Sequence, residues 1–113
     1  MDVKIYHNPR CSKSRSTLAL LQERGLSPTV VEYMNQPPTV SELTEILRLL
    51  GFRPRDLLRK KEAGEVGLND PGLSDEALIK AMVANPAVIE RPIVVANGKA
   101  AIGRPPEFVL AIL

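Results

Sequence analysis

The single cysteine of this chain, Cys11, lies in a short polar segment whose residue types favour a reactive thiol. Apart from Pro9, its neighbours from position 8 to 16 are polar or charged. The neighbours that carry or can acquire positive charge are His7, Arg10, Lys13 and Arg15. Cations and the free backbone N–H groups at a helix start stabilise a thiolate. The pattern predicts a nucleophilic Cys11 rather than the small buried hydrophobe that a lone cysteine usually is.

Three arginines in distant segments are candidates for binding an oxyanion. Arg59 lies near a predicted helical turn, Arg91 in an Arg-Pro step, and Arg104 where a strand gives way to a helix. The planar guanidinium group stays charged and donates two parallel hydrogen bonds to a tetrahedral anion, which lysine does less well. Each arginine alone is more often a solvated surface residue. An anion site therefore requires that the fold gather their loops beside Cys11.

Composition narrows the class of protein. A chain of 113 residues, 44% hydrophobic and 25% charged, predicts one domain over 1–113. The net charge of +2 is spread without a basic run, so we expect no nucleic-acid partner, and no apolar run is long enough to span a membrane. One cysteine forms no internal disulfide, and residues 1–4 lead into a strand rather than a secretory signal. These features predict a cytoplasmic protein.

The amino-terminal third predicts a βαβ unit. The apolar run Val3–Tyr6 is typical of a buried strand, and a helix is expected from Cys11 to Gly25 with Leu18 and Leu21 facing inward. The β-branched run Thr29–Tyr33 predicts a second strand. A right-handed crossover through the helix makes the two strands parallel.

The middle of the chain predicts helices without strands. Thr39 and Glu42 form a capping-box pattern that begins a helix ending at Gly51. We expect a short helical turn over 55–60 and a loop over 64–72, where Gly, Asn, Asp and Pro gather. Ser74 is the expected cap of a further helix that ends before Asn85-Pro86.

The last third predicts a hairpin followed by a helix. Asn97-Gly98 separates the strand-like runs 93–96 and 99–103, and this dipeptide is a strong signal for a two-residue turn. Pro105-Pro106-Glu107 is suited to a helix start, and the helix is expected to continue to Leu113. The order βαβ, helical insertion, ββα is that of an α/β, thioredoxin-like fold with a mixed four-stranded sheet.

Four blocks of sequence, which together span nearly the whole chain, resemble the glutaredoxin-coupled arsenate reductase family, in the family's order and with roughly its spacing. The resemblance is strongest to its short bacterial, arsenate reductase-like members. The blocks are His7-Asn8-Pro9-Arg10-Cys11-Ser12-Lys13-Ser14-Arg15, Leu57-Leu58-Arg59-Lys60, Glu90-Arg91-Pro92-Ile93-Val94-Val95 and Gly103-Arg104-Pro105-Pro106-Glu107.

The resemblance implies a role for each matching residue. Cys11 would attack arsenate and form a covalent thiol–arsenate adduct. The residues that would hold the oxyanion and its intermediates are Arg59, Arg91 and Arg104. The residues that would support the reactive loop are His7, Asn8 and Arg15, although His7 alone is equally well explained as a structural histidine. Pro92 matches the proline that is usually cis in thioredoxin-like folds, which predicts a cis Arg91–Pro92 bond.

The reaction needs a second thiol, which this chain lacks. Ser14, which is also expected to support the reactive loop, stands where a Cys-x-x-Cys motif would place its second cysteine. By the resemblance, glutathione is the thiol co-substrate and glutaredoxin clears the mixed disulfide. We expect no bound cofactor and no metal, since the chain has too few cysteines and histidines for a zinc site.

Two other functions stay open at this level. A regulator of the Spx type shares the fold and binds RNA polymerase, but such proteins typically carry Cys-x-x-Cys where this chain has Cys11-Ser12-Lys13-Ser14. A glutathione-dependent thiol reductase of another substrate would use the same chemistry, with the cationic pocket holding glutathione carboxylates instead of arsenate. A polymerase pull-down tests the first function, and assays on arsenate and on a glutathionylated substrate separate the second from arsenate reduction.

Overall fold

In the computed structural model, which describes residues 2–113, four strands form one mixed sheet in the order β2-β1-β3-β4. The central strand β1 (Val3–His7) pairs in parallel with β2 (Thr29–Glu32) and antiparallel with β3 (Ile93–Ala96). Strand β4 (Lys99–Ile102) continues the sheet antiparallel to β3. The predicted α/β, thioredoxin-like architecture with a mixed four-stranded sheet is confirmed.

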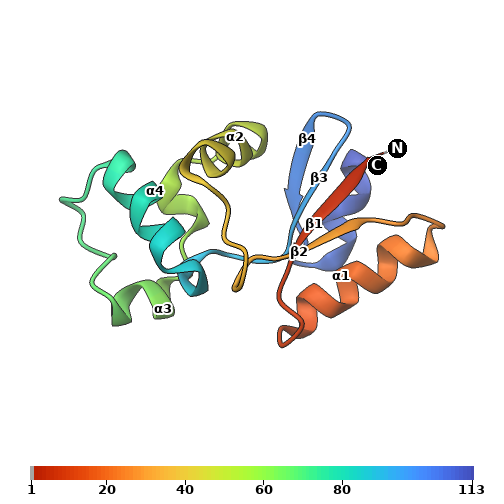
Figure 1. The fold of residues 1–113 in the computed structure, drawn as a ribbon, viewed down its shortest axis with the longest axis horizontal. Coiled ribbons are helices and arrows are strands. Elements are labelled where there is room, and N and C mark those ends of the chain that lie inside the picture. Colours follow the sequence, from red (N-terminus) through yellow and green to blue (C-terminus); the bar gives the residue numbers. More distant parts are fainter. Residues whose placement is uncertain (1) are drawn as a thin grey trace. The chain divides into compact units, whose positions relative to one another are not determined.

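The sheet belongs to the first of two compact units, Met1–Gln36 together with Arg91–Leu113, which we call the sheet unit. Helix α1 (Ser12–Glu23) connects β1 to β2, and it packs with the C-terminal helix against the sheet (Figure 1). The buried apolar side chains of this core are Val3, Ile5, Leu21, Val94, Ala96, Val109 and Ile112. Their burial on one sheet face fixes α1, and therefore the loop that precedes it.

The predicted hairpin is present between β3 and β4. Asn97 and Gly98 have φ values of 54° and 69°, both in the left-handed region that a type I′ turn requires. The side chain of Asn97 also donates to the carbonyl of Ile112 at 2.9 Å. The turn thus sets the register of the hairpin and ties it to the end of the chain.

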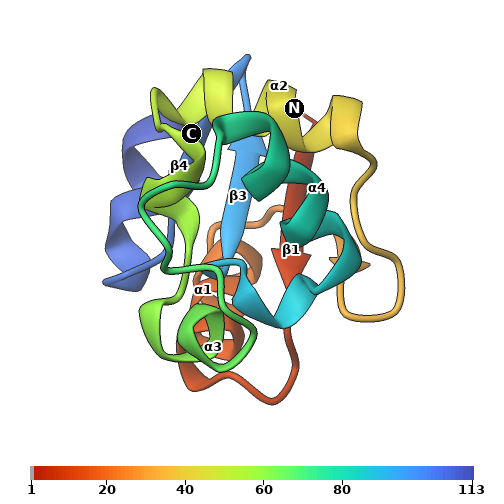
Figure 2. The ribbon, with the colours of Figure 1, turned by 90° about the vertical axis from the view of Figure 1, so that its left-hand side faces the viewer.

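The second unit, Pro37–Glu90, is built from helices and 3₁₀ turns, with one isolated antiparallel bridge between Leu58 and Ile89, and we call it the helical unit. Helix α2 (Val40–Leu50) lies beside α4 (Asp75–Ala84), as Figure 2 shows. The capping box at Thr39, the left-handed Gly51 and the Ser74 cap are all present as predicted. The unit also contains a short helix, α3 (Lys60–Glu65), and two 3₁₀ turns, η1 (Pro54–Leu57) and η2 (Pro86–Val88).

Two local predictions were wrong. The helical turn expected over 55–60 is the shorter η1, and a helix, α3 (Lys60–Glu65), extends into the region predicted to be a loop from Gly64. Ala63 is fully buried and Asn69 donates to the Lys60 carbonyl at 2.8 Å, so tertiary packing holds α3 despite its glycine. The C-terminal helix is present, but as the 3₁₀ helix η3 (Pro106–Ile112).

The two units each have their own buried residues, and a single domain over 1–113 stays a prediction. Within residues 2–113, no helix is both long enough and apolar enough to cross a membrane.

Candidate active site

Cys11 lies at the amino terminus of α1, at the end of a tight turn that follows β1. Its backbone is extended (φ −95°, ψ 123°), and its N–H donates to the carbonyl of Asn8 at 3.0 Å. The side-chain oxygen of Asn8 accepts a hydrogen bond from the N–H of Arg10 at 3.0 Å, and this bond stabilises the turn. Arg15 donates to the carbonyl of Pro9 at 2.9 Å. Asn8 and Arg15 therefore hold the backbone that presents Cys11.

Ser14 is fully buried and connects the turn to the sheet. Its hydroxyl accepts the Asn8 N–H at 3.0 Å and lies 2.6 Å from Nδ1 of His7. Burial lowers the pKa of His7, Glu32 opposes this and Arg15 adds to it, so the neutral imidazole is favoured. A hydrogen bond at this distance joins the Ser14 hydroxyl to the imidazole ring. His7 acts on the reactive loop through this hydrogen bond rather than as the cation considered above.

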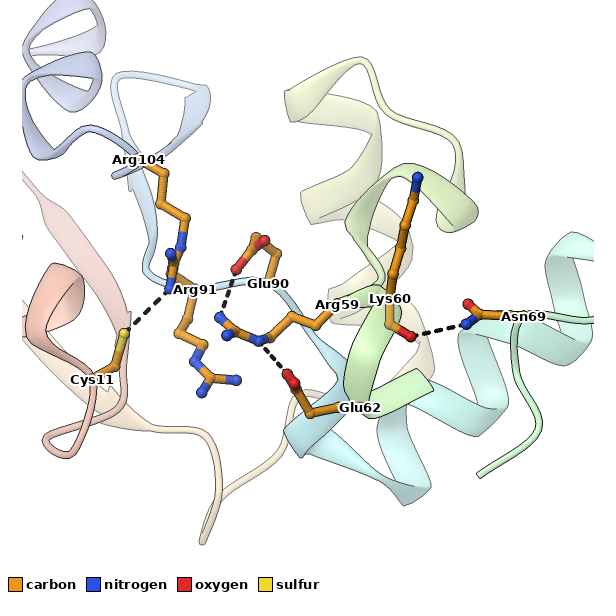
Figure 3. A network of polar contacts seen from close by, with 8 residues as sticks. All are labelled: Cys11, Arg59, Lys60, Glu62, Asn69, Glu90, Arg91 and Arg104. Atoms are coloured by element: carbon orange, nitrogen blue, oxygen red, sulfur yellow. Dashed lines mark hydrogen bonds and ion pairs between the residues drawn. The ribbon is translucent and has the colours of Figure 1, made fainter. Parts of the chain in front are cut away.

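Two arginines of the sheet unit, Arg91 and Arg104, act on the sulfur, and Figure 3 shows the contact that Arg104 makes with it. Arg104 donates from Nη2 to Cys11 Sγ at 3.4 Å, and its Nε–H donates to the carbonyl of Arg91 at 2.7 Å. Arg91 precedes β3 and Arg104 follows β4, and the pairing of the two strands brings the residues together. The β3–β4 hairpin therefore places two guanidinium groups beside the cysteine.

These neighbours shift the ionisation of Cys11. Burial raises the pKa of the thiol, but hydrogen bonds from the Ser14 N–H, the Arg91 side chain and the Lys13 N–H lower it. The charge of Arg104 lowers it further, and the net pKa of Cys11 falls below its ordinary value. A thiolate at a helix start with two guanidinium groups beside it is equipped for nucleophilic attack.

The segment before Arg104 approaches α1 closely. Gly103 is buried, and its N–H donates to the carbonyl of Pro92 at 3.0 Å. The buried Thr17 donates its hydroxyl to the Lys13 carbonyl at 2.8 Å and lies 3.5 Å from the Gly103 carbonyl. The predicted cis Arg91–Pro92 bond is confirmed, and Arg104–Pro105 is also cis. Gly103, Thr17 and Pro92 thus set the path of the chain into Arg104.

A side chain at position 103 is expected to destabilise the protein. A Cβ atom on Gly103 would overlap Oγ1 of Thr17 and lie 2.8 Å from Cγ of Pro92. We expect Gly103→Ala to lower the free energy of unfolding by about 1–3 kcal/mol, measured by urea denaturation. Gly64→Ala is the control, because its Cβ would meet only the end of the Asn69 side chain at 3.1 Å. Equal stability of Gly103→Ala and wild type would contradict this close packing.

Sequence reasoning did not identify Thr17 or Gly103 as supports of the site. The signal was present, since Ser14 and Thr17 are polar residues one turn apart on the inner face of α1. A polar pair on a core-facing helix side indicates hydrogen bonds to an adjacent segment.

Arg59 lies in the helical unit. Its guanidinium forms ion pairs with Glu62 and with Glu90, the second at 2.9 Å (Figure 3). The Arg59 N–H donates to the Val88 carbonyl at 2.7 Å, and the Glu90 N–H donates to that of Leu57 at 2.8 Å. These backbone hydrogen bonds and the two ion pairs together hold Arg59 in place. No cluster of three or more potential metal-ligating His, Cys, Asp or Glu side chains occurs within residues 2–113.

Comparison with known proteins places this arrangement in a family. Residues 6–112 match the ArsC family. The chain belongs to the ArsC family. It is 50% identical to the arsenate reductase of Neisseria meningitidis serogroup A, over 99% of this chain and 98% of that protein. It is 59% identical to protein YfgD of Escherichia coli K12, over 98% of this chain and 96% of that protein.

A solved ArsC structure supports the same assignment. The arsenate reductase from Vibrio cholerae superposes with a TM-score of 0.96 at 52% identity, covering 100% of this chain and 98% of that one. The predicted family membership is confirmed, and with it the thioredoxin-like fold of this ArsC chain.

Proposed function

We propose that this ArsC chain reduces arsenate to arsenite, with Cys11 as the nucleophile. The observation that carries the proposal is the hydrogen bond from Arg104 to Cys11 Sγ at 3.4 Å, together with the Arg91 side chain on the same sulfur. Two guanidinium groups beside the sulfur stabilise its thiolate form. They also lie where they can neutralise negative charge on an oxyanion that the thiolate attacks. Full-length relatives named arsenate reductase support the choice of arsenate among oxyanions.

The first step forms a sulfur–arsenic bond. The Cys11 thiolate attacks arsenic of arsenate, and one oxygen leaves as water after protonation, while arsenic keeps its oxidation state of +5. Arg91 and Arg104 neutralise charge on the remaining oxygens. A role for Arg59 as a third ligand stays a prediction from the family resemblance, and within the helical unit its guanidinium pairs with Glu62 and Glu90.

The second step reduces arsenic. A glutathione thiolate attacks the Cys11 sulfur of the adduct, and the electron pair of the sulfur–arsenic bond passes to arsenic, which leaves as arsenite. A disulfide between Cys11 and glutathione remains. Glutaredoxin then attacks the glutathione sulfur and releases the Cys11 thiolate. Cys11 is the only cysteine, so the second thiol comes from outside the chain. A cytoplasmic location, where glutathione is kept reduced, is part of this proposal.

The test is a turnover assay with arsenate, glutathione and glutaredoxin, in which arsenite formation is measured directly. We expect arsenite only when all three are present. A parallel assay replaces arsenate with a glutathionylated peptide. Turnover of the peptide without any arsenate reduction would contradict the proposal and favour the thiol reductase alternative.

A further inference from the structure

A hollow lies beside the reactive loop, within the sheet unit. Its volume is about 410 Å³, a size typical of small-molecule sites. The residues that line it are His7, Asn8, Pro9, Arg10, Glu32, Met34 and Asn35. All lie at or just after the carboxyl ends of the parallel strands β1 and β2. Ligands of α/β sheets commonly bind at this edge.

The hollow is separate from the arginines at the sulfur. Arg91 and Arg104 flank the β3–β4 hairpin, on one side of β1 in the sheet order, whereas Glu32 and Met34 continue from β2 on the other side. Cys11 is not among the lining residues, but Arg10 directly precedes it. The reactive loop is therefore flanked by an anion-binding pair on the hairpin side and by this hollow on the β2 side.

The lining has a mixed character that suits a zwitterion. It contains one cation in Arg10, one anion in Glu32, two amide side chains in Asn8 and Asn35, and a thioether in Met34, which is 44% exposed. A free α-amino acid group carries a carboxylate, which can bind the guanidinium of Arg10. It also carries an ammonium, which can bind the carboxylate of Glu32. An inorganic oxyanion would be repelled by Glu32, so it fits this hollow less well than the arginine pair.

We propose that this hollow binds the free α-amino acid end of a γ-glutamyl thiol, and so seats the glutathione that attacks the adduct. The inference rests on the proposed function, because that function supplies the need for glutathione. Arg10 holds the α-carboxylate and Glu32 holds the α-ammonium. An extended tripeptide spans roughly 10 Å, so a molecule anchored beside Arg10 brings its thiol to the neighbouring Cys11.

A binding experiment tests the site without turnover. S-methylglutathione, which carries the γ-glutamyl end but no reactive thiol, is titrated into the wild-type protein by calorimetry. We expect saturable binding that Arg10→Gln and Glu32→Gln each weaken about tenfold, because each removes a charge-assisted hydrogen bond. The control variants are Glu23→Gln and Arg24→Gln, two exposed charges at the far end of α1, which should leave the affinity unchanged.

A kinetic experiment separates this inference from the function on which it rests. With arsenate as substrate, Arg10→Gln and Glu32→Gln should raise the KM for glutathione about tenfold and leave the KM for arsenate unchanged. With cysteinylglycine, which lacks the γ-glutamyl group, the variants should equal wild type. The groups that lower the pKa of Cys11 in the structure are Ser14, Arg91, Lys13 and Arg104, and neither Arg10 nor Glu32 is one of them. Iodoacetamide alkylation of Cys11 should therefore also be unchanged in both variants, which shows that the reactive loop is intact.

The outcomes distinguish the two proposals. Binding of S-methylglutathione that depends on Arg10 and Glu32 supports the site even if arsenate is not reduced. Absence of saturable binding, or binding that both variants leave unchanged, overturns the site even if arsenate reduction is observed.

Discussion

Replacing Cys11 with serine is expected to abolish arsenate reduction, with a loss of about a thousandfold or more in kcat/KM. The hydroxyl of serine stays protonated where the thiol is ionised, and a chain with one cysteine holds no other thiol to take its place. Arsenite formation in the presence of glutathione and glutaredoxin measures the effect. Turnover near the wild-type rate would remove Cys11 from the proposed chemistry.

The same variant is expected to keep its fold. Cys11 is only partly buried and lies outside the apolar core of the sheet unit. Serine also suits the start of a helix. Circular dichroism and the midpoint of urea denaturation should therefore match wild type closely. A large fall in stability would mean that lost activity reports unfolding, and the alkylation measurement below would then decide the role of Cys11.

Replacing Arg104 with lysine is expected to lower kcat/KM for arsenate about a hundredfold, although the charge is conserved. Arg104 donates to Cys11 Sγ from Nη2 while its Nε–H holds the Arg91 carbonyl at 2.7 Å. The single ammonium of lysine does not reproduce this fork. Loss of one preformed donor to a developing oxyanion typically costs about 10²-fold or more.

Two comparisons sharpen this prediction. Arg91→Lys should show a similar loss, because the Arg91 side chain bonds to the same sulfur. Arg24→Lys, at an exposed position after α1, is the matched control and should retain wild-type kinetics. Wild-type efficiency in both Arg104→Lys and Arg91→Lys would contradict an anion site built from guanidinium groups.

The sheet unit could be predicted from sequence because its signals are local and mutually consistent. Asn97-Gly98 identified the hairpin, and a thiol between a strand and a helix identified the thioredoxin order. Helix α3 was missed since Gly64 is a poor helix former and burial of Ala63 is a tertiary effect. The 3₁₀ form of η3 was likewise not distinguishable from an α-helix by its apolar spacing.

For the site too, the residue types could be predicted from the sequence but their arrangement could not. Residue type alone indicated that Cys11 and the arginines carry the chemistry, whereas the way in which Arg91 and Arg104 meet depends on the pairing of β3 with β4. The close approach of Gly103 to Thr17 joins residues 86 positions apart, and no local pattern contains such a contact. The hollow at the carboxyl ends of β1 and β2 could not be predicted either, because the residues that line it come from two separate segments of the chain.

The central claim is that Cys11 is held as a thiolate by its neighbours, and the pH dependence of its alkylation tests this most directly. The lowered pKa means that the thiolate predominates above a midpoint lower than that of an ordinary thiol, so the iodoacetamide rate should fall only as pH drops through that lower midpoint. Arg104→Gln and Arg91→Gln should each move the midpoint upward. A wild-type midpoint at or above about 8.5, unmoved by either substitution, would contradict the account.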